Sequence, residues 1–460
     1  MELVAYGLQE QPNLDHRART FLGRLAALIL IALAVSAGFL LFSSQETVIE
    51  ALTPLPKALG LASPVKVRLS NAQGVRRVKA WIEQNGSKYD VFDQQFSGSW
   101  KDWVTKGRQP VTVEFLVGKD RAPGLVPGRA KLVVQAEANN LRGLESRLTQ
   151  EAPVVLGRPS IHVEKDPVLL RRGGTGIVGF RVGGEWSEAG VRVGKYEFPS
   201  FAAKGDPSFR IVVFAYPPDV NLETPPLAFA KNLAGDEVTA IFRHYVTKLQ
   251  FRERDVKIGD AFLNRVVENI DPSGSGELWQ RFAKINSEMR RVNDKFLAGL
   301  NAKTSPTRLW KGSFQLLPKA TNEARFADHR TYIYQGRELN REWHLGVDLA
   351  SVRNAPIPAG NHGIVLFAGM LGIYGNCVVI DHGLGLQSIY GHMAKIEVRE
   401  GEKVERGHII GNTGMTGLAG GDHAHIGMQL HGVFVDPVEW SFAKWIDKKV
   451  MPLMSQIDAK

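Results

Sequence analysis

An uncharged apolar run occupies residues 25–42, with the sequence LAALILIALAVSAGFLLF. At a rise of about 1.5 Å per residue, a helix over this run would span roughly 27 Å, close to the hydrocarbon thickness of a bilayer. Arginines precede the run and glutamates follow it (Arg17, Arg19 and Arg24; Glu46 and Glu50). The positive-inside rule therefore predicts a transmembrane helix, with residues 1–24 in the cytoplasm and everything after Ser43 outside it.

A cleaved signal peptide is the alternative interpretation of this run. The residues VSA at 35–37 resemble a cleavage site, but the apolar run continues beyond them to Phe42. An uncleaved single-pass anchor in the inner membrane is therefore the expected state. Residues 43–64 contain two prolines ahead of the first strand-like run, together with small residues, and are expected to form a linker.

Short runs of β-type residues follow, separated by turn sequences. VKVRL, VRRVKAWI, VTVEFLV and AKLVVQA predict a β-sandwich-like domain over residues 65–155. TGIVGFRV, VRVGKYEF, FRIVVFAY and EVTAIFRHYV predict a second β-rich domain over residues 156–255. From residue 311 glycine is dense and the strands are short, which predicts a compact all-β domain over 311–440 and a C-terminal tail over 441–460. The expected fold class is therefore mainly β.

A helical connector is predicted over residues 256–310, between the β-rich parts. Within ELWQRFAKINSEMRRVNDKFLAGL the apolar positions are spaced alternately four and three apart, at Leu278, Phe282, Ile285, Met289, Val292 and Phe296. This spacing predicts one continuous apolar stripe along a helix. We expect the stripe to pack against a neighbouring domain rather than form a coiled coil, because the repeat is short.

Charge and cysteine content narrow the function classes. The net charge of +10 favours polyanionic surroundings such as a membrane surface or cell-wall polymers. No RNA- or DNA-binding motif accompanies this charge, so we expect no nucleic-acid partner. The single cysteine, Cys377, excludes an internal disulfide and any cysteine-based metal cluster.

Histidine-bearing segments carry the chemistry of the C-terminal domain: HLGVD at 344–348, YGHM around His392, and GDHAHIGM with His423 and His425. Even spacing places both members of each pair on one face of an extended strand. Two imidazoles and one carboxylate would leave zinc an open fourth position for water, as hydrolysis requires. The two remaining histidines could then take a proton and stabilise an oxyanion.

HVEKD at 162–166 has the same histidine–aspartate spacing as HLGVD. Pro167 follows it directly and the next histidine is His244, so we expect a strand edge or turn there and no metal. The other histidines of the C-terminal domain are expected at surface or turn positions, including His382 in the IDHG turn.

The C-terminal segment resembles the lysostaphin-type, or LytM-like, zinc peptidases that cut peptidoglycan cross-links. Their motifs are matched in order by HLGVD, GIVLFAG, YGNCVVIDHG, IYGHM, GEKVERGHIIGNTGMTG and HAHIGM. The likeness covers about residues 325–440. FADHRTY at 326–332 is similar to the family's FGxRxY run, with Ala327 where glycine is common.

The resemblance implies that His344, Asp348 and His425 bind one Zn²⁺ per chain, with His392 and His423 as the unligated catalytic pair. It implies a periplasmic zinc endopeptidase whose partners are peptidoglycan peptide stems and, through residues 25–42, the inner membrane. No other protein partner is indicated.

Several alternatives stay open from the sequence. The bond cut can be the D-Ala–diaminopimelate link or a glycine bridge, and the division of roles between the two unligated histidines is undecided. A non-catalytic LytM-like regulator that activates another wall hydrolase is the alternative function. A scaffold whose β-domains bind the wall is a further alternative. The complete five-residue set favours the enzyme.

Overall fold

The computed structural model describes residues 14–99, 101–105, 107–164 and 167–458. The chain divides into two compact units, one reaching Gly157 and including Asn232–Asp236, the other formed by Arg158–Lys231 with Glu237 onward. The predicted mainly β fold is confirmed, with 44% strand and 20% helix. The domain boundaries proposed above stay predictions.

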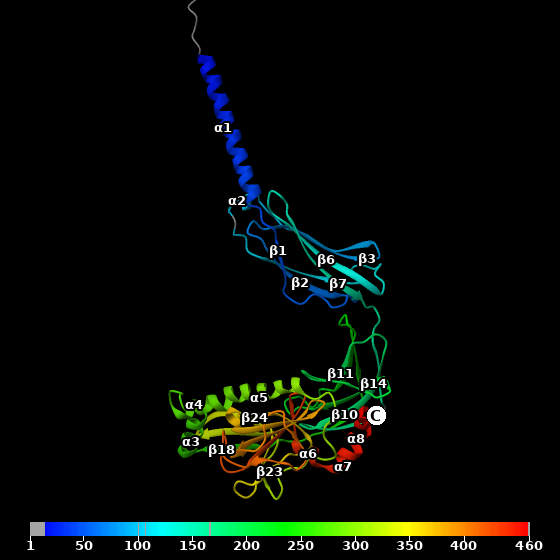
Figure 1. Ribbon diagram of the computed structural model, residues 1–460, viewed down its shortest axis with the longest axis vertical. Coiled ribbons are helices and arrows are strands. Elements are labelled where there is room, and N and C mark those ends of the chain that lie inside the picture. The colour runs from blue at the N-terminus through cyan, green and yellow to red at the C-terminus, as the bar shows by residue number, and fades with distance from the viewer. Residues whose placement is uncertain (1–13, 100, 106, 165–166, 459–460) are drawn as a thin grey trace, which may run out of the picture. The chain divides into compact units, whose positions relative to one another are not determined.

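Unit 1 begins with an apolar helix, α1 (Leu14–Phe42) (Figure 1). Its part Arg19–Phe42 is long and apolar enough to cross a membrane. Residues 1–13, the first part of the predicted cytoplasmic segment, lie outside the described residues.

Two antiparallel sheets follow in unit 1. The first has the order β1-β2-β5 and the second β4-β3-β6-β7. Alternate residues of β2, such as Val65 and Val67, and of β5, such as Val113 and Phe115, enter the core that the two sheets share. This is the predicted sandwich-like arrangement. The elements are β1 (Val48–Ala51), β2 (Ser63–Ser70), β3 (Val75–Gln84), β4 (Ser87–Gln95), α2 (Asp102–Thr105), β5 (Val111–Val117), β6 (Gly128–Ala138) and β7 (Glu145–Val154).

Unit 2 opens with two further four-stranded sheets, in the orders β13-β14-β10-β8 and β12-β11-β15-β16, and a parallel pair, β9 and β17. His162 of HVEKD lies exposed on β8, opposite Arg181, while Asp166 lies outside the described residues. The elements are β8 (Ser160–Val163), β9 (Val168–Arg171), β10 (Thr175–Gly183), β11 (Glu188–Val193), β12 (Tyr196–Pro199), β13 (Phe201–Ala203), β14 (Asp206–Ala215), β15 (Leu227–Lys231), β16 (Glu237–Ile241) and β17 (His244–Thr247).

The C-terminal half of unit 2 is built on one large antiparallel sheet with the strand order β19-β22-β30-β26-β25-β24-β28, extended by β31 beside β30. Smaller sheets, β18-β20-β21 and β23-β29-β27, accompany it. The strands are β18 (Glu253–Ile258), β19 (Thr321–Ala324), β20 (Asp328–Tyr334), β21 (Arg337–His344), β22 (Val347–Ala350), β23 (Pro356–Pro358), β24 (Gly363–Met370), β25 (Asn376–Gly383), β26 (Leu386–Met393), β27 (Lys395–Ile396), β28 (Lys403–Val404), β29 (Ile409–Asn412), β30 (Ala424–Leu430) and β31 (Val433–Val435).

Helices accompany this sheet before and after it in the chain. Those of the predicted connector are α3 (Asp260–Ile270), α4 (Leu278–Lys284) and α5 (Arg290–Gly299). In Figure 1 α5 runs alongside β24, and a ring contact joins Phe296 of α5 to Phe367 of β24 at 5.2 Å between centroids. The chain ends in α6 (Pro437–Ser441), α7 (Ala443–Trp445) and α8 (Met451–Asp458), and α8 buries Met454.

The predicted apolar stripe of the connector is correct in its first half and wrong in its second. Phe282 and Ile285 are buried as expected, but Val292 is 65% exposed whereas its neighbour Asn293 is only 6% exposed. A π-helical turn, Ile285–Met289, separates α4 from α5. A π turn accommodates one extra residue, which rotates all later side chains by about 100° relative to an unbroken α-helix.

His382 is the other position where the structure overturns an expectation. It lies on β25 and is fully buried, not at a surface turn. Its Nδ1 lies 2.8 Å from the carbonyl oxygen of His362 and its Nε2 2.7 Å from Ser388 Oγ. Burial lowers the pKa of His382 to about 4. The side chain is therefore a neutral, fully hydrogen-bonded member of the core.

Candidate metal centre

Three neighbouring strands bring the HLGVD motif against the second HxH histidine. His344 ends β21, Asp348 lies on β22, and His425 lies directly opposite Asp348 on β30. The chain crosses from β21 to β22 at Gly346. A Cβ atom there would lie 2.5 Å from the His425 imidazole, so only glycine allows this close approach.

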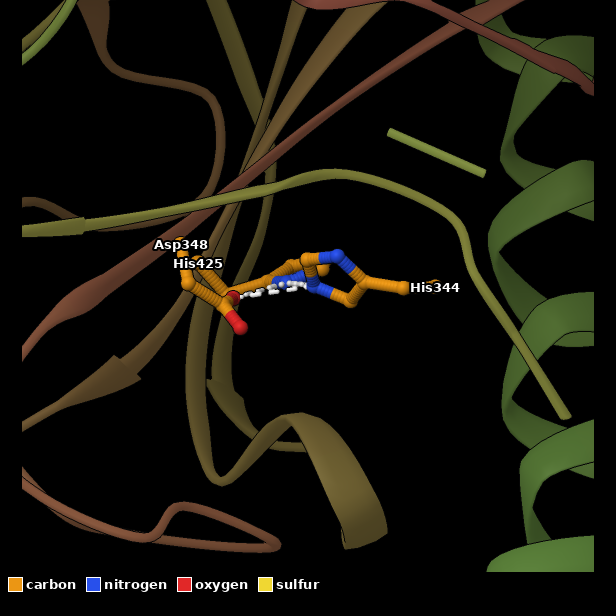
Figure 2. Close-up of side chains that lie close together, drawn as sticks. All are labelled: His344, Asp348 and His425. Atoms are coloured by element: carbon orange, nitrogen blue, oxygen red, sulfur yellow. Dashed lines mark hydrogen bonds and ion pairs between the residues drawn. The ribbon is translucent and has the colours of Figure 1, made fainter. Parts of the chain in front are cut away.

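The side chains of these three residues converge on one point (Figure 2). His344 Nε2 lies 2.9 Å from Asp348 Oδ1 and 3.0 Å from His425 Nδ1, and the last two atoms are 3.0 Å apart. Ligand atoms of tetrahedral zinc, bonded at about 2.0–2.1 Å, lie roughly 3.3 Å from one another. Because each of these atoms carries a lone pair and all lie close to that separation, the donor set fits a zinc ion.

Two of the candidate ligands, His344 and Asp348, are each oriented by a hydrogen bond at the side-chain atom that does not face the metal position. The His344 Nδ1–H donates to the Arg325 carbonyl oxygen at 3.0 Å, which leaves Nε2 free to bind a metal. Arg330 donates to Asp348 Oδ2 at 2.8 Å, which leaves Oδ1 for the centre. Burial alone would raise the pKa of Asp348, but His344 and the other imidazoles hold it well below its usual value. The carboxylate is therefore ionised, as a metal ligand must be.

The two other predicted histidines lie beside this group. The His392 and His423 rings have centroids 4.9 Å apart. His392 Nδ1 lies 2.8 Å from the Thr416 carbonyl oxygen, and His423 Nδ1 lies 2.8 Å from that of Gly421. In the neutral imidazole of each residue, donation to these carbonyls leaves Nε2 as the proton-accepting atom. Burial lowers the pKa of His423, but Asp348, whose Oδ1 lies 3.5 Å from His423 Nε2, raises it above its usual value.

His392 adopts an unusual backbone conformation, with φ of 62°. The left-handed region costs a non-glycine residue about 1–2 kcal/mol, and such positions cluster at functional sites. The structure thus brings all five predicted residues to one cavity of about 80 Å³, whose wall also includes Arg290, Arg330 and Tyr374.

Comparison with known proteins bears on this domain. Residues 342–437 match peptidase family M23, a span that contains all five residues of the site. The C-terminal part of the chain is a peptidase M23 domain. The predicted likeness to lysostaphin-type peptidases is therefore confirmed for the M23 domain.

The relatives are similar over only part of this chain. The DD-carboxypeptidase/endopeptidase Mpg of Neisseria meningitidis is 37% identical over 107 residues, covering 23% of this chain and 25% of Mpg. The peptidoglycan DD-endopeptidase ShyA of Vibrio cholerae is 37% identical over 89 residues, covering 19% of this chain and 21% of ShyA. The match thus spans about a quarter or less of each relative.

Among solved structures, the catalytic domain of lysostaphin from Staphylococcus simulans is 23% identical with a TM-score of 0.24. This alignment covers 32% of the present chain and 99% of the lysostaphin domain.

Arg330, Tyr374 and Arg290 are among the cavity residues that the sequence did not indicate. Arg330 stands in FADHRTY, whose likeness to a family run was the available signal. Tyr374 begins YGN, and its ring packs edge-on against His425 with centroids 5.5 Å apart. Arg290 lies outside the M23 match and belongs to no motif. Its position in the cavity comes only from the packing of α5.

In FADHRTY, Ala327 stands at a position where glycine is common in the family. Ala327 has φ of 58°, the left-handed region in which glycine is favoured. This turn aims the Arg325 carbonyl at His344, and the Ala327 amide donates to the His344 carbonyl oxygen at 2.7 Å. The segment therefore positions the first predicted ligand.

Proposed function

We propose that this chain is a zinc-dependent endopeptidase that hydrolyses peptide cross-links in peptidoglycan. The observation that carries the proposal is the convergence of His344 Nε2, Asp348 Oδ1 and His425 Nδ1 within about 3 Å of one another beside two further histidines. Relatives named as a DD-carboxypeptidase/endopeptidase and as a peptidoglycan DD-endopeptidase support the substrate class.

The site residues divide into a ligand set and a proton-handling set. His344, Asp348 and His425 would hold the ion. Zinc in such a site supplies a Lewis acid that polarises the scissile carbonyl and makes water a stronger nucleophile. His392 and His423 both line the cavity, and in its neutral form each has an unprotonated Nε2, so that one can accept the proton of the attacking water. The other, once protonated, donates to the developing oxyanion.

We propose further that α1 anchors the enzyme in the inner membrane, with the M23 domain outside. The apolar span Arg19–Phe42 is long enough for this role, and the arginine cluster before it supports a cytoplasmic N-terminus. The net charge of +10 suits work between an anionic membrane surface and an anionic wall.

The test is cleavage of purified cross-linked muropeptide dimers by the full chain in detergent, with release of monomers followed by chromatography. His392→Ala and His423→Ala should each retain one zinc but lose about 10²- to 10⁴-fold in kcat. His408→Ala, an exposed histidine of the same domain, is the matched control and should behave as the wild type. A folded, zinc-loaded wild type that releases no monomer would instead favour the regulator.

A further inference from the structure

Arg290 lies in the wall of the metal cavity. The proposed hydrolysis gives this arginine no role. It is the first residue of α5, after the π-helical turn, and lines the same cavity as His344, His392 and His423. The peptidase match begins only at residue 342, so this guanidinium is supplied to the site from outside the matched domain.

The orientation of this guanidinium is fixed by a chain of amides. Arg290 Nε donates to the Asn286 carbonyl oxygen at 3.0 Å, and Nη2 donates to Asn286 Oδ1 at 2.6 Å. Asn286 is fully buried, and its Nδ2 donates to Asn340 Oδ1 at 2.9 Å. Asn286 is one of the two buried residues of the π turn. A guanidinium held in this way loses little freedom when it binds a ligand.

Most of the donor capacity of Arg290 is unused. A guanidinium has five N–H groups, and among the described residues only the two bonds to Asn286 engage them. Both acceptors are neutral oxygens. The cavity's other guanidinium, Arg330, is already engaged by Asp348 at 2.8 Å. Arg290 is therefore the arginine in this cavity that lacks a carboxylate partner among the described residues.

Two carboxyl groups lie near Arg290 without pairing with it. Burial raises the pKa of Asp294, whose Oδ1 accepts the Tyr374 hydroxyl at 2.8 Å, and burial also raises the pKa of Glu342. The charge of Arg290 acts against both shifts, but neither group forms an ion pair with it among the described residues. Neither carboxyl group therefore occupies the remaining N–H groups of Arg290 in the described part of the chain.

We propose that Arg290 binds a carboxylate of the substrate beside the scissile bond, and so makes the enzyme selective for D-Ala–diaminopimelate cross-links. This inference rests on the proposed function. In that cross-link the amine side of the scissile amide carries a free carboxylate on the adjacent carbon, whereas a glycine bridge has none at this position. The planar fork of a guanidinium binds a carboxylate through two parallel hydrogen bonds.

The experiment compares three muropeptide dimers that differ at this one group: the free diaminopimelate carboxylate, its amide, and the lysine analogue that lacks it. The wild-type full chain should prefer the free carboxylate. Arg290→Gln should lose roughly 10- to 100-fold in kcat/KM on that dimer, the value of a charge-assisted hydrogen-bonded pair, and change little on the other two. Arg290→Lys should recover part of the loss. Arg291→Gln, an exposed neighbouring arginine, is the matched control.

Binding separates this inference from the proposed function. Calorimetry of each dimer on zinc-loaded His392→Ala, with and without Arg290→Gln, needs no cleavage. Arg290→Gln should weaken binding of the free-carboxylate dimer alone and leave zinc content unchanged. An equal loss on all three dimers, or none on the free carboxylate, would overturn the role of Arg290 even if the enzyme cleaves. If the wild type cleaves no dimer although binding still depends on the carboxylate, the proposed hydrolysis is overturned instead.

Discussion

Glu439 of α6 is a buried carboxyl group whose titration should make the stability of unit 2 depend on pH. Its Oε2 accepts the backbone amide of Thr175 on β10 at 2.7 Å, and Arg171 lies 4.0 Å from Oε1. Burial outweighs these favourable contacts and raises the pKa of Glu439 from 4.5 to about 7. The change to test is Glu439→Gln, which keeps an acceptor oxygen and removes the titration.

The magnitude and sign follow from this pKa. A tenfold change in proton affinity is worth about 1.4 kcal/mol, so a rise from 4.5 to about 7 amounts to about 3 kcal/mol. The folded-state pKa lies above the unfolded-state value. The stabilisation from the protonated group is therefore fully present below about pH 4.5 and is lost as the pH rises through about 7. Relative to Glu439→Gln, the wild type should lose about 3 kcal/mol across this window.

Hydrogen exchange of peptides that cover β10, read by mass spectrometry between pH 4.5 and pH 8, measures the opening free energy around Thr175. Both proteins are compared at the same pH, so the intrinsic exchange rate cancels. Glu268→Gln, an exposed glutamate on α3, serves as the control and should run parallel to the wild type. Parallel curves for wild type and Glu439→Gln would refute the reasoning, because they would mean that Glu439 titrates alike in the folded and unfolded chain.

Three further outcomes are expected. Asp348→Ala should lose zinc while His162→Ala keeps it; equal zinc content by atomic emission would contradict the choice of HLGVD over HVEKD. Leu297→Ala should destabilise the fold by about 2–5 kcal/mol in denaturant unfolding and Val292→Ala by less than about 0.5, since only the former is buried; equal losses would argue against the π turn. Protease added to spheroplasts should digest the chain beyond Ser43, and full protection of the M23 domain would reverse the proposed topology.

The sequence was most informative where chemistry demands fixed residues at fixed spacing. HLGVD, YGHM and HAHIGM indicated five residues that the structure brings to one cavity. Gly346 shows why such motifs can be recognised in a sequence: glycine is required there because no other residue leaves room for the His425 imidazole. Alternating apolar residues likewise indicated the sandwich-like sheets of unit 1.

Periodicity failed where local geometry departed from the ideal repeat. The apolar stripe of the connector assumed an unbroken α-helix, so it assigned Val292 to the core in place of Asn293. Nothing in the residue pattern marks a π turn there. Arg290 was missed for the same reason, because its place in the cavity depends on the turn before it and on the packing of α5. His382 was misassigned because the end of a buried strand reads like a turn.

The central claim, hydrolysis of a peptidoglycan cross-link, is tested most directly by mass spectrometry of the products formed in heavy-oxygen water. The zinc-loaded full chain and a defined D-Ala–diaminopimelate dimer are the only other components. We predict two monomers, with one heavy oxygen atom in the new D-Ala carboxylate, and neither product with Asp348→Ala. An intact dimer after prolonged incubation with a folded protein that holds one zinc per chain would contradict it.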